Sequence, residues 1–286
     1  MKLSELQQIL DTEFCIKQND ENLCDFAIVD TNKQYFCNDF IQRKTALMTI
    51  NSENIEIVLT SVFITEEIIQ KACTFKNALL ITHHNFDYFE DKRGLQPIKP
   101  EYFRELQRCN ISLYVAHAPL DTHQVYGTSK CLAELCGVTI DKYFYDYFGA
   151  PTALIGYIKK TTFKEFSEYI QKTLERPVLT LEKKKDYVEK IAVVAGGGDL
   201  PDILQQIYHF ECDTYITGTV EHRWAVPFIQ EGNKQFHELN KKLNINLIGG
   251  THYGTERPAM IKLIKYINNL GLDCKYIEDN TLLNSK

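Results

Sequence analysis

The sequence predicts an α/β protein built around largely parallel sheets, and three observations lead to this prediction. Short apolar runs alternate with stretches of helical period along most of the chain. Residues that favour helix starts and stops stand between these runs. The composition of the 286 residues, 44% hydrophobic and 24% charged, is ordinary for globular proteins and allows a sizeable core. Strands that alternate with helices form parallel sheets through right-handed crossovers.

The first half of the chain supplies the clearest strand–helix–strand units. The apolar strand at 78–82 follows a helix for which Thr65 is the expected N-cap, with Glu66 and Glu67 in the first turn. The expected elements are a helix at 1–10, short strands at 24–30 and 35–37, a strand at 55–60, a helix at 65–73, the strand at 78–82, a helix at 100–108 and a strand at 111–117.

The second half contains enough further strands for a second α/β domain. Gly137 is a plausible stop for the first helix of this part, and Pro258 is tolerable in the first turn of the last helix. The expected elements are a helix at 129–136, a strand at 153–158, helix 162–174, strands 177–181 and 191–195, helix 200–209, strand 214–217, a helical run after 220, strand 245–250 and helix 259–270.

Charge and cysteine usage exclude several classes of protein. The net charge of −6 and pI of about 5.8 argue against direct nucleic-acid binding. No apolar run approaches about 18 residues and the N-terminus does not read as a signal peptide, so a cytoplasmic protein without a membrane span is expected. The nine cysteines are scattered without a Cys-x-x-Cys pair, which argues against a disulfide framework and a thiolate zinc site.

Histidines and carboxylates recur where expected strands end. In open α/β sheets, ligands bind outside the carboxyl ends of the strands. Imidazole and carboxylate ligands together suit zinc, manganese, iron, cobalt or nickel better than calcium, and two metals sharing a carboxylate would account for so many ligands. Taken one by one, each could instead be a helix cap or a surface residue. The candidates are His83, His84, His117, Asp121, His252 and Glu256.

Two further stretches leave alternatives open. Gly196–Gly198, ahead of a helix, can hold an anion such as phosphate on backbone amides or can make a tight, closely packed turn. Its spacing fits neither a P-loop nor a dinucleotide fingerprint. The segment after Thr217–Thr219 carries His222, Arg223 and Trp224, which are either a partly buried helix start or substrate contacts.

Five motifs in order resemble the Nif-three-like family, whose members are labelled GTP cyclohydrolase 1 type 2 homologues. The motifs are Ile81-Thr-His-His84, Ala116-His-Ala-Pro-Leu-Asp121, Val194-Ala-Gly-Gly-Gly198, Tyr215-Ile-Thr-Gly218 and Gly250-Thr-His-Tyr-Gly-Thr-Glu-Arg257. The resemblance implies two α/β domains of the Nif-three-like fold. Residues 1–125 and 245–286 would form the metal-binding domain and residues 126–244 the second. It also implies two bound divalent metal ions and a homohexamer.

By motif, the resemblance implies that His83, His84, Asp121, His252 and Glu256 are metal ligands, with Glu256 bridging. His117 would lie beside the metals or transfer protons. Phe63 and Thr219 stand where relatives commonly have acidic residues, and the segment from Asn85 also departs from the family pattern.

The function expected from the resemblance is that of a dinuclear divalent-metal-dependent hydrolase. Its substrate would be a small molecule, a nucleotide or a related heterocycle or phosphoester, with GTP ring opening as one specific case. The altered residues around the ligands motivate an alternative, a non-catalytic metal-binding or regulatory protein of the same family. A third reading, a partner of transcriptional proteins, follows from the family name alone.

Overall fold

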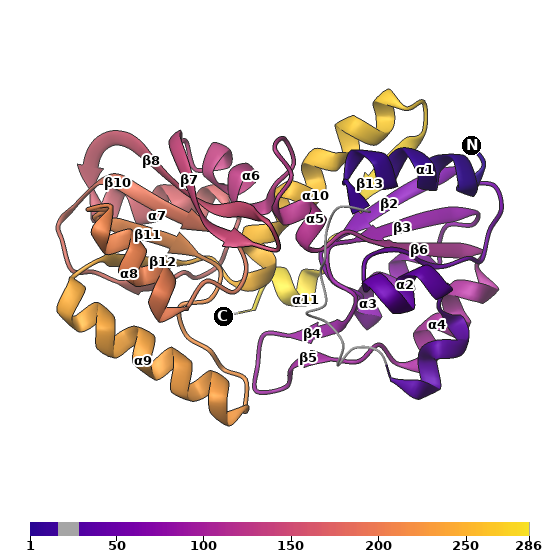
Figure 1. Ribbon diagram of the computed structural model, residues 1–286, viewed down its shortest axis with the longest axis horizontal. Helices are drawn as coiled ribbons and strands as arrows, with labels where there is room; N and C mark the ends of the chain where they lie inside the picture. Colours follow the sequence, from indigo (N-terminus) through magenta and orange to yellow (C-terminus); the bar gives the residue numbers. More distant parts are fainter. Residues whose placement is uncertain (17–28, 286) are drawn as a thin grey trace. The chain divides into compact units, whose positions relative to one another are not determined.

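The computed structural model describes residues 1–16 and 29–285. The chain divides into two compact units, each made of three segments of sequence (Figure 1). Unit 1 comprises Met1–Tyr88, Leu95–Tyr126 and Met260–Asn280, and unit 2 comprises Phe89–Gly94, Gly127–Ala259 and Thr281–Lys286. Each unit has its own sheet and its own core, and an α/β fold is therefore present in both.

Unit 1 is built on a five-stranded sheet in the order β1-β6-β3-β2-β13. Neighbouring strands from β6 to β13 are parallel, as predicted, whereas β1 pairs with β6 in the antiparallel direction. The strands β2, β3 and β6 are almost wholly buried, which explains their nearly continuous apolar sequences. Their bounds are β1 Ala46–Thr49, β2 Ile57–Ser61, β3 Ala78–Thr82, β6 Ile111–Val115 and β13 Asp273–Tyr276.

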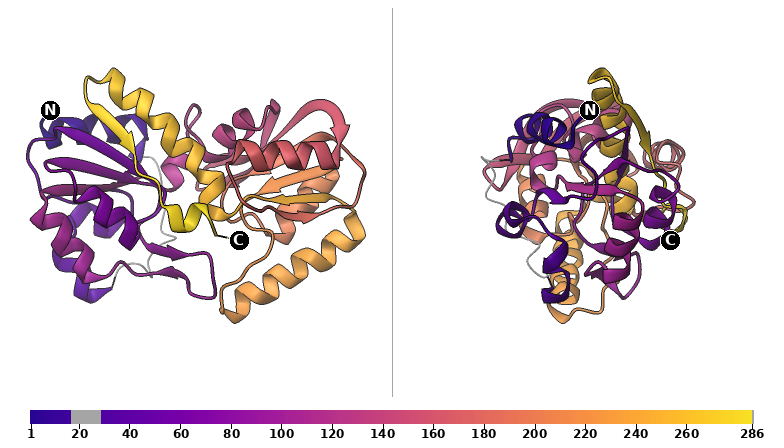
Figure 2. Two further views of the ribbon diagram at one scale, coloured as in Figure 1. Left: turned by 180° about the vertical axis from the view of Figure 1, so that it is seen from behind. Right: turned by 90° about the vertical axis from the view of Figure 1, so that its right-hand side faces the viewer.

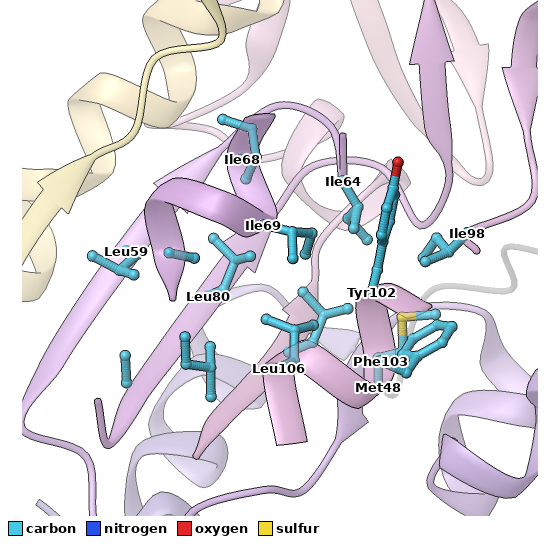
Figure 3. Packing of buried hydrophobic residues seen from close by; sticks show 14 of the residues in the cluster. Met48, Leu59, Ile64, Ile68, Ile69, Leu80, Ile98, Tyr102, Phe103 and Leu106 are labelled. Carbon is cyan, nitrogen blue, oxygen red and sulfur yellow. The ribbon is translucent and has the colours of Figure 1, made fainter. Parts of the chain in front are cut away.

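Helices cover both faces of this sheet. Alternate strand residues such as Leu59 and Leu80 pack against α3 (Glu66–Ala72) and α4 (Pro100–Arg108), whose apolar side chains point into one cluster (Figure 3). Thr65 caps α3 as predicted, since its hydroxyl accepts the Ile68 N–H at 3.3 Å. On the other face, the Tyr114 hydroxyl donates to Asp11 of α1 (Leu3–Glu13). There too the Thr60 hydroxyl donates to the carbonyl of Met260 in α10 (His252–Asn269).

The opening region differs from its prediction. Residues 35–37 do not form a strand, because they link the 3₁₀ helix η3 (Asp30–Tyr35) to α2 (Asn38–Arg43). Phe36 and Phe40 turn their rings into the core of unit 1 instead of alternating between two faces. Most of the strand expected at 24–30 lies outside the described residues.

Unit 2 is built on a mixed six-stranded sheet in the order β7-β8-β10-β11-β12-β9. Its central strands β10, β11 and β12 are parallel, and β8, β9 and β7 are antiparallel to their neighbours. The bounds are β7 Thr139–Tyr147, β8 Ala150–Thr162, β9 Thr180–Glu182, β10 Tyr187–Val194, β11 Thr214–Thr217 and β12 Asn246–Gly249.

Both faces of the second sheet are also covered by helices. Ile191 and Val193 face α6 (Thr128–Leu135) and α7 (Phe163–Thr173), whereas Ala192 and Val194 face α8 (Pro201–His209) and α9 (Pro227–Leu243). Successive strand residues point to opposite faces, so the same strand serves two cores. In the view from behind, α7 and α9 lie on different sides of this sheet (Figure 2).

Two boundaries at the end of unit 2 differ from the predictions. The expected first domain included residue 245 onward, but β12 pairs with β11 in the second sheet, so these residues up to Ala259 belong to unit 2. The last helix was expected from residue 259, yet α10 begins at His252 and has Pro258 in its interior. The Thr251 hydroxyl accepts the Gly254 N–H at 3.1 Å and thereby starts the helix earlier.

The remaining elements are short. A two-stranded ribbon pairs β4 (Asp87–Phe89) with β5 (Gly94–Gln96), and short helices α5 (Ala118–Asp121) and α11 (Asn280–Leu283) follow β6 and β13. Among residues 1–16 and 29–285, no helix is both long and apolar enough to span a lipid bilayer.

Candidate metal centre

The histidine pair His83–His84 lies directly beyond the end of β3 in unit 1, and both rings are buried. The His83 N–H donates to Ser61 and the His84 N–H to Val62, both at the end of β2 or just beyond it. Adjacent side chains of a regular strand point to opposite faces, but these two ring centroids are only 4.4 Å apart. The chain has therefore left the strand, and both imidazoles face the same place, as the sequence predicts.

His117 and Asp121 approach the pair from the end of the neighbouring strand β6. The His117 ring centroid lies 4.9 Å from that of His83 and 4.8 Å from that of His84. Asp121, at the end of α5, places Oδ1 3.5 Å from Nε2 of His83. One ring nitrogen from each of the three histidines lies within 4.8 Å of the others. The three buried histidines and the partly exposed Asp121 thus form a group of nitrogen and oxygen donors within unit 1.

A backbone hydrogen bond orients His83 within this group. Its Nδ1 lies 2.9 Å from the carbonyl oxygen of Ala116, which can only accept a hydrogen bond. The proton therefore resides on Nδ1, and Nε2 offers its lone pair on the side of Asp121. Histidines that bind a metal through one ring nitrogen usually donate the N–H of the other to a hydrogen bond in this way.

A stack of aromatic rings holds His84. Phe63 lies parallel to His84 at a centroid distance of 4.4 Å and an angle of 7°, and Tyr88 stacks on Phe63 at 4.2 Å. All three rings are buried. Phe63 therefore supplies a flat apolar support for the His84 ring. The departure at Phe63 is visible in the sequence, whereas nothing in the sequence signals Tyr88.

In unit 2, His252 and Glu256 lie one turn apart on the same side of α10. Glu256 Oε1 is 3.0 Å from His252 Nε2, and both residues are buried. The helix start at Thr251 makes this pairing possible, because residues four apart in a helix are neighbours. One helical turn therefore presents the imidazole and the carboxylate side by side.

The glycine-rich stretch packs closely against this pair. A Cβ at Gly196 would lie 2.3 Å from Glu256 Oε1, and one at Gly198 would lie 2.3 Å from the hydroxyls of Thr217 and Tyr215. The Gly196 N–H donates to Thr255, so this amide is already used within the protein. Close packing is thus the interpretation that the geometry favours, and Gly196 does not act as an amide donor to an anion.

A second carboxylate–imidazole pair, buried Asp199 and partly buried His222, lies in the loops after β10 and β11. Their side chains approach to 3.5 Å, and Asn233 donates to the other carboxylate oxygen of Asp199 at 2.8 Å. Burial raises the pKa of Asp199 to about 6 and lowers the pKa of His222 to about 4, with the charge of His252 adding to the second shift. Partial burial thus favours the neutral form of His222. Sequence reasoning had singled out His222 without identifying its partner.

The donor chemistry of both sets fits divalent metals. The set in unit 1 is His83, His84, His117 and Asp121, and the set in unit 2 is His252 and Glu256. Buried imidazole nitrogens and carboxylate oxygens suit zinc and its first-row neighbours. The prediction that particular residues of both sets are metal ligands stays a prediction, as does the role of His117.

Comparisons with known proteins give a consistent family. The model of the Duf34/NIF3 (NGG1p interacting factor 3) family matches residues 47–281. A GTP cyclohydrolase 1 type 2 homolog of Borreliella burgdorferi is 30% identical over 210 residues, which cover 72% of this chain and 77% of that protein. The homolog of the same name from Escherichia coli K12 is 22% identical over 283 residues, covering 97% and 98% of the two chains.

Solved structures agree on the fold. A protein described as "ybgI, unknown function" superimposes with a TM-score of 0.72 at 22% identity, covering 98% of each chain. TTHA1606 from Thermus thermophilus does so with a TM-score of 0.70 at 21% identity, covering 98% of this chain and 99% of its own. Because the family model spans most of the sequence and relatives match over most of their length, this chain belongs to the Duf34/NIF3 family.

Proposed function

We propose that this protein is a divalent-metal-dependent hydrolase that acts on a nucleotide or a related heterocycle or phosphoester. The observation that supports it most is the buried cluster of His83, His84 and His117 with Asp121 3.5 Å from His83. Clustered imidazole nitrogens beside a carboxylate oxygen are the donor set that zinc and its first-row neighbours bind. The printed names of the relatives, GTP cyclohydrolase 1 type 2 homologs, point to a guanine nucleotide as the first substrate to try.

The proposal assigns a task to each residue of the two sets. His83, His84 and Asp121 in unit 1 and His252 and Glu256 in unit 2 would hold the divalent ions. Ions held there supply positive charge that polarises a carbonyl, imine or phosphate oxygen and acidifies water. Phe63 fixes the plane of His84, and the carbonyl of Ala116 fixes the tautomer of His83. His117, beside both rings, moves a proton between substrate and solvent.

Metal content and turnover test this proposal together. Protein purified without chelator is expected to carry zinc, manganese, iron, cobalt or nickel, measured by elemental analysis. His84→Ala and Glu256→Ala are each expected to lower the metal content and to abolish hydrolysis of GTP or a phosphoester. His117→Ala should retain metal and lose turnover. His209→Ala, a control on α8, should change neither. Full metal occupancy in both His84→Ala and Glu256→Ala would refute the metal assignment.

One observation favours a second candidate, a metal-binding regulatory protein without turnover. Phe63 covers one face of His84 with an apolar ring, and the family resemblance leads us to expect acidic residues at the positions of Phe63 and Thr219. Neither the phenyl ring nor the threonine hydroxyl can take up a proton as a carboxylate does. Metal-loaded protein that hydrolyses neither nucleotides nor phosphoesters with any of the five metals would favour this candidate over the hydrolase.

A further inference from the structure

A separate cluster of metal-binding side chains lies between α3 and α4 in unit 1. Cys73 and Cys109 are the residues that directly follow these two helices, and Glu105 lies in the last turn of α4. One donor atom from each of the three side chains lies within 4.8 Å of the others. Cys109 is buried in the core of unit 1, Cys73 is half-buried, and Glu105 is exposed. An ion from solvent can therefore reach sulfur atoms that are partly shielded from water.

This cluster is distant from the histidines of the same unit. In a parallel α/β sheet the helices run antiparallel to the strands, so the C-terminal end of each helix lies near the beginning of the next strand. Cys73 precedes β3 and Cys109 precedes β6, whereas His83 and His117 follow the same two strands. A strand of five residues is about 16 Å long, so the two clusters lie at opposite edges of the sheet.

Backbone carbonyls surround the two thiols. The Cys73 thiol donates to the carbonyl of Glu105 at 3.5 Å, and the Cys109 thiol donates to the carbonyl of Cys73 at 3.7 Å. The last carbonyls of a helix carry partial negative charge, which favours a cation. Burial is the main cause that raises the pKa of Cys73 to about 12, so the sulfur carries its proton until a metal displaces it. A neighbouring cation, Arg108, pairs with Glu105 at 2.6 Å.

We propose that Cys73, Cys109 and Glu105 form a second metal site that takes a soft divalent ion of the zinc class. Binding forms two metal–sulfur bonds and one metal–oxygen bond, and both thiol protons leave to solvent. Ligands of a tetrahedral zinc lie about 4 Å apart, so the three groups need only small movements to close on an ion. Water fills the fourth position. The fold thus assembles a cysteine pair that the absence of a Cys-x-x-Cys motif had argued against.

Cadmium is a suitable probe because thiolate coordination gives an ultraviolet charge-transfer band that imidazole and carboxylate ligands do not give. Full-length protein is stripped with a chelator, kept reduced and titrated with Cd²⁺. Wild type is expected to develop a band with the intensity of two thiolates on one Cd²⁺ per chain, after any Cd²⁺ taken up by the histidines, and excess Zn²⁺ should remove it. Cys73→Ser and Cys109→Ser should each weaken binding by at least about tenfold, and Glu105→Gln by about tenfold.

Matched variants separate this site from the histidines and from other thiols. Cys274 is a buried cysteine in β13, away from the cluster. The variants Cys274→Ser and His84→Ala should both keep the band at wild-type strength. Far-ultraviolet circular dichroism checks that each variant is folded. Of the two cysteines, Cys73 is the less buried, so Cys73→Ser disturbs the core less than Cys109→Ser does. Absence of the band in reduced wild type, or its persistence in both Cys73→Ser and Cys109→Ser, would overturn the proposal. Neither result depends on hydrolase activity.

Discussion

At position 196, a hydrogen atom stands where any other amino acid would place a carbon against the candidate metal centre. Gly196 has a φ of +72°, and a Cβ there would lie 2.3 Å from Glu256 Oε1 and 3.1 Å from His252 Nε2. Gly196→Ala should therefore cost about 1–2 kcal/mol of stability through the left-handed backbone. It should also push the Glu256 carboxylate aside and lower the metal content.

Urea unfolding and elemental analysis of the purified variant measure these two effects. Gly232→Ala is a matched control, because a Cβ at Gly232, inside helix α9, meets no atom within 4 Å. This control should gain about 0.5–1 kcal/mol, the usual advantage of alanine over glycine in a helix. Wild-type stability and metal content in Gly196→Ala would show that the close approach to Glu256 has no consequence.

Asp87 gives unit 1 a pH dependence opposite to that of most carboxylates. Burial raises its pKa to about 6, although the Tyr88 N–H and the Tyr102 hydroxyl both donate to it. The unfolded chain then releases this proton at a lower pH than the folded one. The contribution of Asp87 to stability is therefore complete below pH 4 and is lost as the pH rises from about 4 to about 6. After allowance for solvent screening, the loss is about 1–2 kcal/mol.

Asp87→Asn keeps an acceptor for Tyr88 and removes the ionisation. Its stability relative to wild type should improve by about 1–2 kcal/mol between pH 4.5 and pH 7, as measured by urea unfolding of metal-free protein. The exposed Asp141 is a suitable control, since Asp141→Asn should track wild type across this range. An Asp87→Asn difference that is the same at both pH values would contradict the argument.

Among the elements, the short helix α11 has its last carbonyls bound by one distant side chain. The buried guanidinium of Arg176 donates to the carbonyls of Leu282, Leu283 and Ser285, the first at 2.8 Å. These carbonyls have no following helical turn to bond them. Arg176→Ala should cost about 2–3 kcal/mol, and Arg176→Lys should recover little because lysine lacks the planar fork.

Hydrogen exchange of the amides at 280–285 checks this prediction, together with urea unfolding. Exchange there should accelerate in Arg176→Ala, since the carbonyls lose their donors and the short helix frays. Arg104→Ala should leave the exchange unchanged and the free energy of unfolding within about 0.5 kcal/mol of wild type, because Arg104 is exposed and forms a surface ion pair with Glu101. Unchanged exchange in Arg176→Ala would mean that α11 is held by its packing alone.

Elements with a strong local signal were predictable from the sequence. The strands at 78–82 and 214–217 and the N-cap at Thr65 are present as predicted. The misses have long-range causes. Strand β1 and the edge strand β13 are defined by pairing with β6 and β2, which lie far away in sequence. Strand β12 was assigned to the wrong domain because its neighbours β11 and β9 are not evident from its own residues.

The candidate site shows the same division. Strand ends carrying histidines predicted that His83, His84 and His117 would meet, and their rings do lie within 5 Å of one another. Sequence could not reveal that Phe63 stacks on His84 and Tyr88 on Phe63, or that Asp199 pairs with His222, because these contacts depend on loop conformation. For Gly196 and Gly198, the sequence left open whether they bind an anion or pack closely, because the choice depends on atoms from distant segments that lie beside them.

At the scale of the whole molecule, the two units differ in how the chain builds them. All six strands of the second sheet lie between Thr139 and Gly249 in one continuous stretch. The first sheet instead needs β13, which arrives only after the chain has completed most of unit 2. Its residues Thr60 and Thr65 also donate to Met260 and Asp279, far along the sequence. Unit 1 therefore cannot complete its sheet from the first segment of the chain.

This difference predicts opposite behaviour for two fragments. Residues 127–259 contain the whole second sheet and both of its cores, so this fragment should fold and unfold cooperatively in urea, although it lacks the partners of Arg176. Residues 1–126 leave β2 as an open edge and two buried hydroxyls without acceptors, so this fragment should aggregate or lack a cooperative transition. Circular dichroism and size-exclusion chromatography distinguish the outcomes. A cooperative transition in 1–126, or its absence in 127–259, would show that the chain's path does not determine which unit is autonomous.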